Sequence, residues 1–225
     1  MYKKIRDISV IVSSNNRSLV YLKVLEKNGF LPNKIIFLKD PKKNIYNKKI
    51  FSFLSENNKI QFIKIFKSKN INNKQIIKYL KAQPEKIYIV SLYPGQDGII
   101  KNKEILKKKN FMHSHTGKLP DYKGSTTVYY SLLKEGKIWC DTFFLNEKID
   151  QGRLIYSQSY PIPKNIYTIE SEYDSKIRAL NIVSSLKKII NTKKIFLKKK
   201  KNTTLNYYII HPILRLITFR KYKNV

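Results

Sequence analysis

The residues best suited to chemistry in this sequence are two histidines and one aspartate near the middle of the chain. His113 and His115 are two residues apart, so on a β-strand both side chains would project from the same face. Asp150 follows in a short turn that ends at Gly152. A carboxylate beside an imidazole fixes the tautomer of the ring and raises its basicity, which is the arrangement of a general base with an orienting partner.

Spacing alone leaves three interpretations of these three side chains open. The first is proton transfer by a histidine paired with the aspartate. The second is a zinc ion, because two histidines and an aspartate can supply three ligands and leave a fourth position open. The third is purely structural, with polar side chains at a strand end that hydrogen-bond to neighbouring loops.

Segments with strand and helix patterns alternate from residue 8 to about residue 135, so we predict an α/β fold with a mainly parallel sheet. Residues 40–58 are rich in Asn and Lys and predict a loop with a helical turn. The predicted strands are 8–12, 34–38, 60–66, 86–92, 111–115, 139–145 and 153–158, and the predicted helices are 18–28, 72–82, 99–109, 125–135 and 168–192.

The carboxyl ends of parallel strands share one edge of a sheet, where α/β proteins bind their ligands. The loops after residues 12, 38, 92 and 115 are therefore expected at that edge, and they hold most of the unusual residues. The run Gly124–Thr127 opens a predicted helix, whose N–H groups and hydroxyls can hold an anion or a sugar hydroxyl, or can simply cap the helix.

The composition is that of a folded globular chain, with 42% apolar residues in 225. Its apolar runs are shorter than the ~18 residues that a membrane-spanning helix needs. The single cysteine, Cys140, fits a reducing compartment, so we expect a cytoplasmic protein. The formal net charge is +31, but Lys supplies nearly all of the cations, whereas nucleic-acid contacts favour Arg. Abundant Lys, Ile and Asn with two Ala indicate an AT-rich genome, so codon bias is the first interpretation of this charge and a functional role the second. We expect no nucleic-acid partner and a surface that attracts anionic ligands such as nucleotides.

Two linked motifs resemble those of the folate-dependent formyltransferases. The segment His113–Gly124 reads HSHTGKLPDYKG, and the family signature is N-x-H, four residues, then L-P-x-Y-x-G. The segment Asp141–Gly152 is similar to the second motif of the family, a Thr followed eight residues later by D-x-G, here Thr142 and Asp150. The resemblance covers roughly residues 88–158, and the first 87 residues match only in the order of strands and helices.

The resemblance implies a Rossmann-like catalytic domain over residues 1–160, with helices on both faces of the sheet. It also implies 10-formyltetrahydrofolate as the donor of a formyl group to a primary amine, and no metal. His115 and Asp150 match the catalytic His and Asp of the family. His113 stands where the family has an Asn, and it can likewise donate a hydrogen bond to the oxyanion that forms when the amine attacks.

The same resemblance implies two binding regions. The predicted pterin-binding residues are Tyr93, Pro94, Gly95, Gln96, Asp97 and Gly98. The predicted substrate-binding residues are Tyr122, Gly124, Ser125 and Thr126.

The expected acceptor is the amine of a nucleotide-linked sugar used in surface glycans, reached by elimination. The run 13–18 lacks the glycines of a glycinamide ribonucleotide phosphate loop, and the 67 residues after Gln158 are too few for the β-barrel of the methionyl-tRNA enzyme. Those two substrates stay alternatives, as does a noncatalytic or altered-donor relative that serves as a basic ligand-binding module. Residues 161–225 are expected to form a long helix and a basic, aromatic tail that packs on the core, with a homodimer contact or an anionic membrane surface as the other options.

Overall fold

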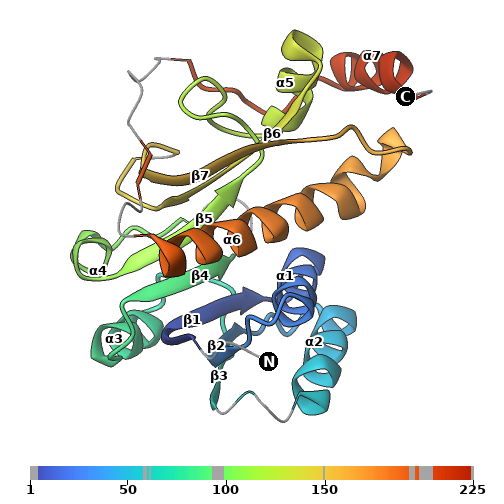
Figure 1. Ribbon diagram of the computed structural model, residues 1–225. Helices are drawn as coiled ribbons and strands as arrows, with labels where there is room; N and C mark the ends of the chain where they lie inside the picture. Colours follow the sequence, from blue (N-terminus) through green and yellow to red (C-terminus); the bar gives the residue numbers. More distant parts are fainter. Residues whose placement is uncertain are drawn as a thin grey trace. The chain divides into compact units, whose positions relative to one another are not determined.

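The computed structural model describes residues 5–57, 60, 62–92, 99–148, 150–192, 196–197 and 205–223. The chain folds into two compact units, Met1–His113 and Ser114–Val225. The strand order is β3-β2-β1-β4-β5-β6-β7, which confirms the predicted α/β class (Figure 1). The domain boundary expected near residue 160 is a separate matter and stays a prediction.

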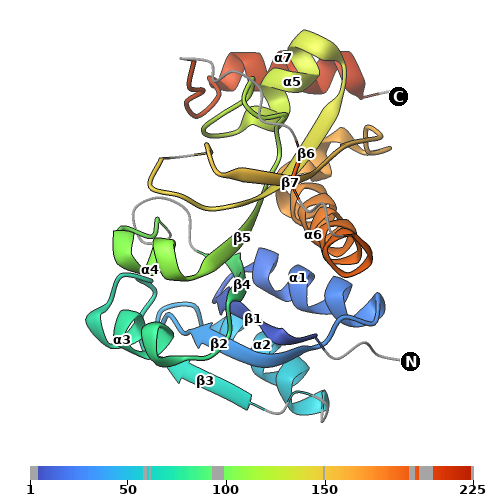
Figure 2. The ribbon, with the colours of Figure 1, turned by 60° about the vertical axis from the view of Figure 1, so that its left-hand side comes forward.

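The first unit is a parallel sheet with helices on both faces. Figures 1 and 2 show α1 and α2 on one face and α3 and α4 on the other. The elements are β1 Ile5–Ser13, α1 Asn16–Lys27, β2 Pro32–Leu38, α2 Asn44–Glu56, β3 Phe62–Phe66, α3 Lys74–Ala82, β4 Ile87–Ser91, α4 Lys103–Lys108 and β5 Asn110–His115, whose last two residues belong to the second unit. Strand β1 pairs in parallel with β2 and β4, β2 with β3, and β4 with β5.

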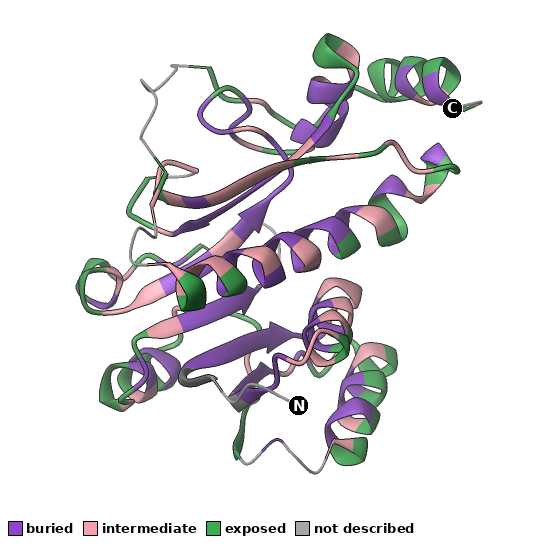
Figure 3. Ribbon diagram, in the orientation of Figure 1, coloured by how far each residue is buried: buried purple, intermediate pink, exposed green. Residues whose placement is uncertain are grey.

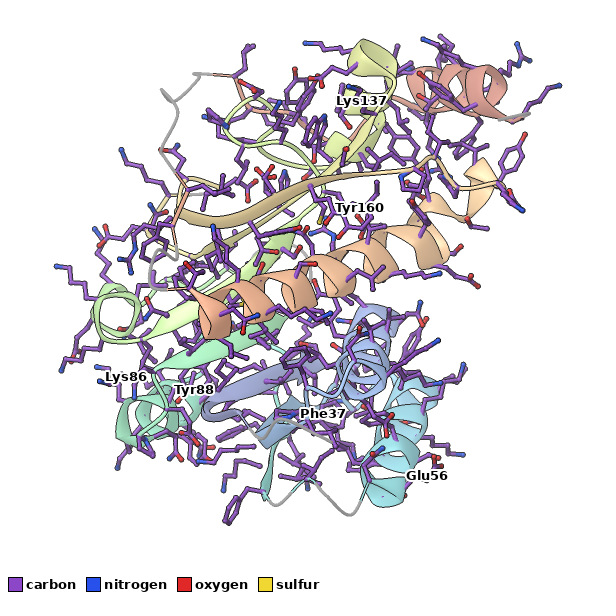
Figure 4. The ribbon with its side chains drawn as sticks, viewed as in Figure 1. Phe37, Glu56, Lys86, Tyr88, Lys137 and Tyr160 are labelled. Carbon is purple, nitrogen blue, oxygen red and sulfur yellow. The ribbon has the colours of Figure 1, made fainter. Side chains whose placement is uncertain are left out.

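The central strands of this unit are largely buried (Figure 3), and their apolar side chains form its core. Val10, Ile11 and Val12 on β1 have no exposed surface. Tyr88 on β4 (Figure 4) is equally buried. Its ring stacks on that of Phe111 at a centroid distance of 5.4 Å. Since a strand that is apolar on both faces must be covered on both, this pattern explains the two helical layers.

Helix α2 corrects the prediction of a loop with a helical turn over residues 40–58. The helix has 13 residues, and Ile50, Phe53 and Leu54 lie buried at the i, i+3, i+4 spacing of one face. The ring of Phe51 also makes an edge contact with Phe37 of β2, 5.4 Å between centroids. The Asn and Lys residues on the exposed face made the segment look polar in the sequence, so its short apolar stripe did not predict a full helix.

Hydrogen bonds join the residues that follow β1 to those that follow β2 and to the last residue of β4, at the carboxyl edge of the parallel strands. The Ser14 hydroxyl donates to the Asn47 side chain at 2.5 Å and accepts from the Asp40 N–H at 2.9 Å. The Ser18 hydroxyl donates to the Ser91 carbonyl at 3.1 Å. Asn15 caps α1 by accepting from the N–H of Ser18, so the polar turn at 13–18 acts as the helix start that the sequence indicates.

The second unit contains an antiparallel pair of strands covered by one long helix. Helix α6 packs on β6 and β7 (Figure 2). After the end of β5 the elements are α5 Thr127–Glu135, β6 Ile138–Phe144, β7 Arg153–Tyr160, η2 Ile166–Thr168, η3 Ile169–Tyr173, α6 Asp174–Asn191 and α7 Pro212–Tyr222.

The helix predicted over 168–192 begins as α6 only at Asp174. A 3₁₀ turn, η2, and a π turn, η3, precede it. These two turns bring Ile166 and Ile169 into the same buried cluster as Ile177 of α6. The regular α-helical hydrogen-bond pattern is interrupted here, because the irregular turns allow all three isoleucine side chains to be buried.

The tail docks on α5. Ile210 and Tyr222 are buried in one cluster with Tyr129 and Leu132, and the Tyr222 hydroxyl donates to the Leu132 carbonyl at 2.8 Å. Both views place α7 beside α5 (Figures 1 and 2). In the described part of the chain, no helix has the length and apolarity needed to cross a membrane.

Candidate active site

His115, at the end of β5, is held by contacts on one edge of its ring. The side chain is buried, and its Nε2 atom lies 2.7 Å from the Tyr122 carbonyl oxygen and 3.1 Å from the Thr127 hydroxyl. The Thr127 hydroxyl donates its own hydrogen to the Thr116 carbonyl. Both neighbours of Nε2 are therefore acceptors, so Nε2 carries the proton of the neutral ring and donates to them. The basic lone pair of the neutral ring lies on Nδ1.

Gly117 makes this arrangement possible. A Cβ atom at this position would lie 2.7 Å from the Tyr122 carbonyl oxygen, 2.9 Å from His115 Nε2 and 3.0 Å from the Thr127 hydroxyl. Any side chain would therefore push apart the groups that fix the tautomer of His115. Sequence reasoning did not assign Gly117 or Thr127 to the His115 site, although Gly117 lies within the histidine motif and Thr127 is the first residue of α5.

Asp150 faces the other edge of the ring. Its Oδ2 atom lies 3.8 Å from His115 Nδ1 and accepts a hydrogen bond of 2.8 Å from the backbone N–H of Gly124. The backbone of Asp150 has φ of 52°, a left-handed conformation that Asp tolerates better than most residues. Two residues later, a Cβ on Gly152 would lie 1.8 Å from the Phe144 carbonyl oxygen, so this turn requires glycine.

The geometry suits a ring that takes up a proton at Nδ1. A proton taken up there would create an N–H that faces the Asp150 carboxylate, whose Oδ2 atom lies 3.8 Å from Nδ1. The N–H of Gly124 holds that carboxylate in place, and the contacts of Nε2 hold the ring in place. The structure thus brings together His115 and Asp150, as the sequence predicts, and adds Gly124 as the group that connects them to the following loop.

A buried ion pair from α6 holds the backbone on both sides of His115. Arg178 donates from Nη1 to the Ser114 carbonyl and from Nη2 to the Thr116 hydroxyl at 2.8 Å. Its Nε donates to Asp174 Oδ2 at 2.8 Å, and the Thr116 hydroxyl donates to Asp174 Oδ1 at 2.7 Å. Arg178 and Asp174 are each 9% exposed, so this charged pair stands in a dry environment. No sequence pattern pointed to it.

Residues of the second sequence motif form hydrogen bonds with the end of β5 and with the loop after it. The Thr142 hydroxyl of β6 donates to the Ser114 hydroxyl at 3.2 Å and accepts from the Asn181 amide at 2.9 Å. The Asp141 carboxylate accepts from the N–H of Leu119 at 2.7 Å and so holds the loop after β5. Burial raises the pKa of the Cys140 thiol to about 12, so this cysteine is no nucleophile near neutral pH.

The predicted substrate side of the site carries contacts with the tail. The backbone of Tyr207 accepts from the N–H of Ser125 at 2.8 Å, and the Thr126 hydroxyl accepts from the N–H of Ile210 at 2.8 Å. The start of α5 is thus hydrogen-bonded to the tail of the chain, and Thr126, its N-cap residue, makes no side-chain cap hydrogen bond, so the simple capping alternative is not what the structure shows.

Tyr122, on the same predicted substrate side, is also tied to the protein. Its hydroxyl donates to Glu135 at 2.6 Å, and its ring stacks on that of Tyr207, 5.6 Å between centroids. Burial and the Glu135 carboxylate both raise the pKa of Tyr122, so its hydroxyl stays protonated.

The remaining predicted residues lie elsewhere. His113 is half-buried on β5, in the first unit. The predicted folate residues Tyr93–Gly98 lie outside the described residues. Among the residues that the structure describes, no cluster of three His, Cys, Asp or Glu side chains has the arrangement of a metal site.

The sequence matches no protein-family model and no curated protein. The structure is similar to a sugar N-formyltransferase from a Shewanella species, with 13% identity, a TM-score of 0.61 and coverage of 94% of this chain and 86% of that chain. It is also similar to phosphoribosylglycinamide formyltransferase from Anaplasma phagocytophilum, with 13% identity, a TM-score of 0.57 and coverage of 92% and 99%.

A third similar structure is an N-formyltransferase from Helicobacter canadensis in complex with folinic acid and dTDP-3-aminofucose. Its identity is 18% and its TM-score 0.52, with coverage of 91% of this chain and 71% of that chain. Likeness at such identities shows the fold alone. The chain has the fold of the N-terminal domain of formyltransferases.

Proposed function

We propose that this protein transfers a formyl group from 10-formyltetrahydrofolate to the primary amine of a nucleotide-linked amino sugar. The observation that supports the proposal most directly is the pairing of His115 Nδ1 with Asp150 Oδ2 at 3.8 Å. The pair lies in a protein with the formyltransferase fold, at the two positions that match the family's catalytic His and Asp.

In this proposal the donor supplies an activated formyl carbon, and the chain supplies proton transfer and orientation. His115 takes the amine proton at Nδ1, because Nε2 already donates to Tyr122 and Thr127. Asp150 stabilises the charged ring, which would then return the proton to N10 of the donor as the N10–formyl bond breaks and tetrahydrofolate leaves. His113 would donate a hydrogen bond to the formyl oxygen, the task of the Asn that the family has there. The donor's pterin would bind at Tyr93–Gly98, which lie outside the described residues. The case for this donor therefore depends on the His115–Asp150 pair.

Two features favour a nucleotide sugar as the acceptor. Sugar N-formyltransferases are among the similar structures, and one of them holds folinic acid and dTDP-3-aminofucose. The net charge of +31 attracts a diphosphate group. Glycinamide ribonucleotide is the second candidate, favoured by the enzyme from Anaplasma phagocytophilum, of which the match covers 99%.

The test is formylation of a panel of amines with 10-formyltetrahydrofolate, followed by mass spectrometry of the products. The panel contains dTDP-3-amino and 4-amino sugars and glycinamide ribonucleotide. We expect formylation of a dTDP-amino sugar, and a loss of kcat of about 100-fold or more in Asp150→Asn. Asp121→Asn is the matched control, an exposed aspartate in the loop after β5 that should keep full activity.

Two outcomes would contradict the proposal in different ways. Calorimetric binding of 5-formyltetrahydrofolate without turnover on any amine would favour a noncatalytic relative. No binding and no turnover would favour an altered donor. The variant His113→Asn, which restores the family's residue, separates these cases further, because formyl transfer gained by this variant alone would mark the natural chain as inactive.

A further inference from the structure

Helix α7 has a buried face and an exposed apolar face. Thr218 and Tyr222 are buried, and the Tyr222 hydroxyl donates to the Leu132 carbonyl of α5, whereas Ile213, Leu216 and Ile217 are 62%, 48% and 46% exposed. These three residues follow the i, i+3, i+4 spacing of one face, and at 100° per residue that face points away from the buried one. An apolar stripe on the outer side of a docked helix has no role in holding that helix to the protein.

The exposed apolar surface extends into the chain just before the helix. Tyr208 and Ile209 are 80% and 78% exposed, although their neighbours Tyr207 and Ile210 are held on α5. A concentration of exposed apolar side chains of this kind marks an interaction site more often than scattered single residues do. We call the set Tyr208, Ile209, Ile213, Leu216 and Ile217 the outer face of the tail.

The charges around this face have one sign. Arg220 follows Ile213, Leu216 and Ile217 on the same side of α7, and Lys221 and Lys223 are exposed beside it. Residues 193–225 contain eight Lys, two Arg and no Asp or Glu. Arg215 pairs with Glu170 of η3 at 3.4 Å, on the inner side of the helix. The outer face is thus apolar, aromatic and basic, and its own segment offers no acidic group.

We infer that the outer face of the tail binds the surface of an anionic lipid bilayer. Ile and Leu side chains enter the boundary between headgroups and acyl chains, a tyrosine suits that interface, and Lys and Arg attract anionic headgroups. A second copy of the chain, packed with the same face, would bring Arg220, Lys221 and Lys223 against their own counterparts, and residues 205–223 hold no carboxylate to meet them. Nucleic acid would leave the Ile and Leu stripe without an apolar partner. The inference uses no residue of the His115 site and does not depend on the proposed function.

The experiment is sedimentation of the full chain with sucrose-loaded vesicles of phosphatidylcholine alone, or with 30% phosphatidylglycerol. We expect binding to the anionic vesicles and little to the neutral ones. The triple variant Ile213→Gln, Leu216→Gln, Ile217→Gln should bind at least tenfold more weakly, because it removes the inserted side chains. Arg220→Gln with Lys221→Gln should weaken binding by about 30-fold, since one cation near an anionic surface contributes about fivefold.

Matched controls come from the first unit. Ile45, Phe62 and Ile63 are 69%, 57% and 43% exposed, so their replacement by Gln removes a similar apolar area elsewhere. This control triple variant should bind like the natural protein, and so should Lys42→Gln with Lys43→Gln.

Three results would overturn the inference. The first is no binding to anionic vesicles, and the second is equal binding by the tail variant and the control variants, which would assign the effect to net charge alone. The third is a dimer in analytical ultracentrifugation that the Ile213, Leu216 and Ile217 replacements convert to a monomer. That result would show that the outer face is the contact between two copies of the chain.

Discussion

The replacement Arg178→Met tests whether the buried ion pair of α6 holds the strand end that carries His115. Met fills a similar volume and removes the guanidinium, which donates to Asp174, to the Ser114 carbonyl and to the Thr116 hydroxyl. The Asp174 carboxylate then stays buried without the guanidinium, and it keeps the hydrogen bond from the Thr116 hydroxyl. An uncompensated charge at such a site costs about 3–5 kcal/mol, so we expect the free energy of unfolding to fall by that amount.

The double variant Arg178→Met, Asp174→Asn separates charge from packing. It removes both charges, so it should recover at least half of the loss, because no unpaired ion is left in the interior. Trp139 of β6 is the one tryptophan of the chain, so its fluorescence during urea unfolding reports on the second unit. A loss below about 1 kcal/mol for the single variant would refute the argument, as would a double variant no more stable than the single one.

Three further predictions follow from single contacts. Gly152→Ala should destabilise the second unit by more than about 2 kcal/mol in urea, because its Cβ would lie 1.8 Å from the Phe144 carbonyl oxygen; an unchanged midpoint would contradict this. Cys140 should resist iodoacetamide at pH 8 until urea unfolds the chain, since burial raises the pKa of its thiol to about 12. Glu135 has a pKa lowered chiefly by the hydrogen bond from Tyr122, so its stabilisation is complete above the ordinary pKa of 4.5 and is lost as pH falls. The destabilisation caused by Tyr122→Phe should therefore shrink between pH 7 and about pH 3, and a constant difference would refute the link.

Short-range patterns in the sequence were enough to predict the fold class. Strand and helix periodicity places β1, α1, β2, α3, β4, α4, α5, β6 and β7 close to where they lie. Helix α2 was missed because its apolar stripe is short and its other residues are polar. The start of α6 was misplaced because burial of Ile166 and Ile169 depends on packing that periodicity does not contain.

The candidate site was predicted only in part, because some of its contacts join distant residues. The sequence motifs single out His115 and Asp150, and the structure places them together. Arg178 reaches Ser114 across 64 residues, and only the folded sheet and helix reveal that contact. The groups at the start of α5 look available for a ligand in the sequence, but the tail, some 80 residues away, supplies their hydrogen-bond partners.

The two nitrogens of His115 separate the interpretations that spacing alone leaves open. A structural role accounts for Nε2, which donates to a carbonyl and a hydroxyl that can only accept from it. It does not account for Nδ1, which bears the lone pair and faces a carboxylate at 3.8 Å. The Asp150 carboxylate that faces Nδ1 is the contact on which the proposed proton transfer depends, and the contacts of Nε2 hold the ring in that orientation. Replacing Thr127 by Val removes one acceptor and leaves Asp150 in place, so any resulting loss of activity would arise from ring orientation and not from the charge beside Nδ1.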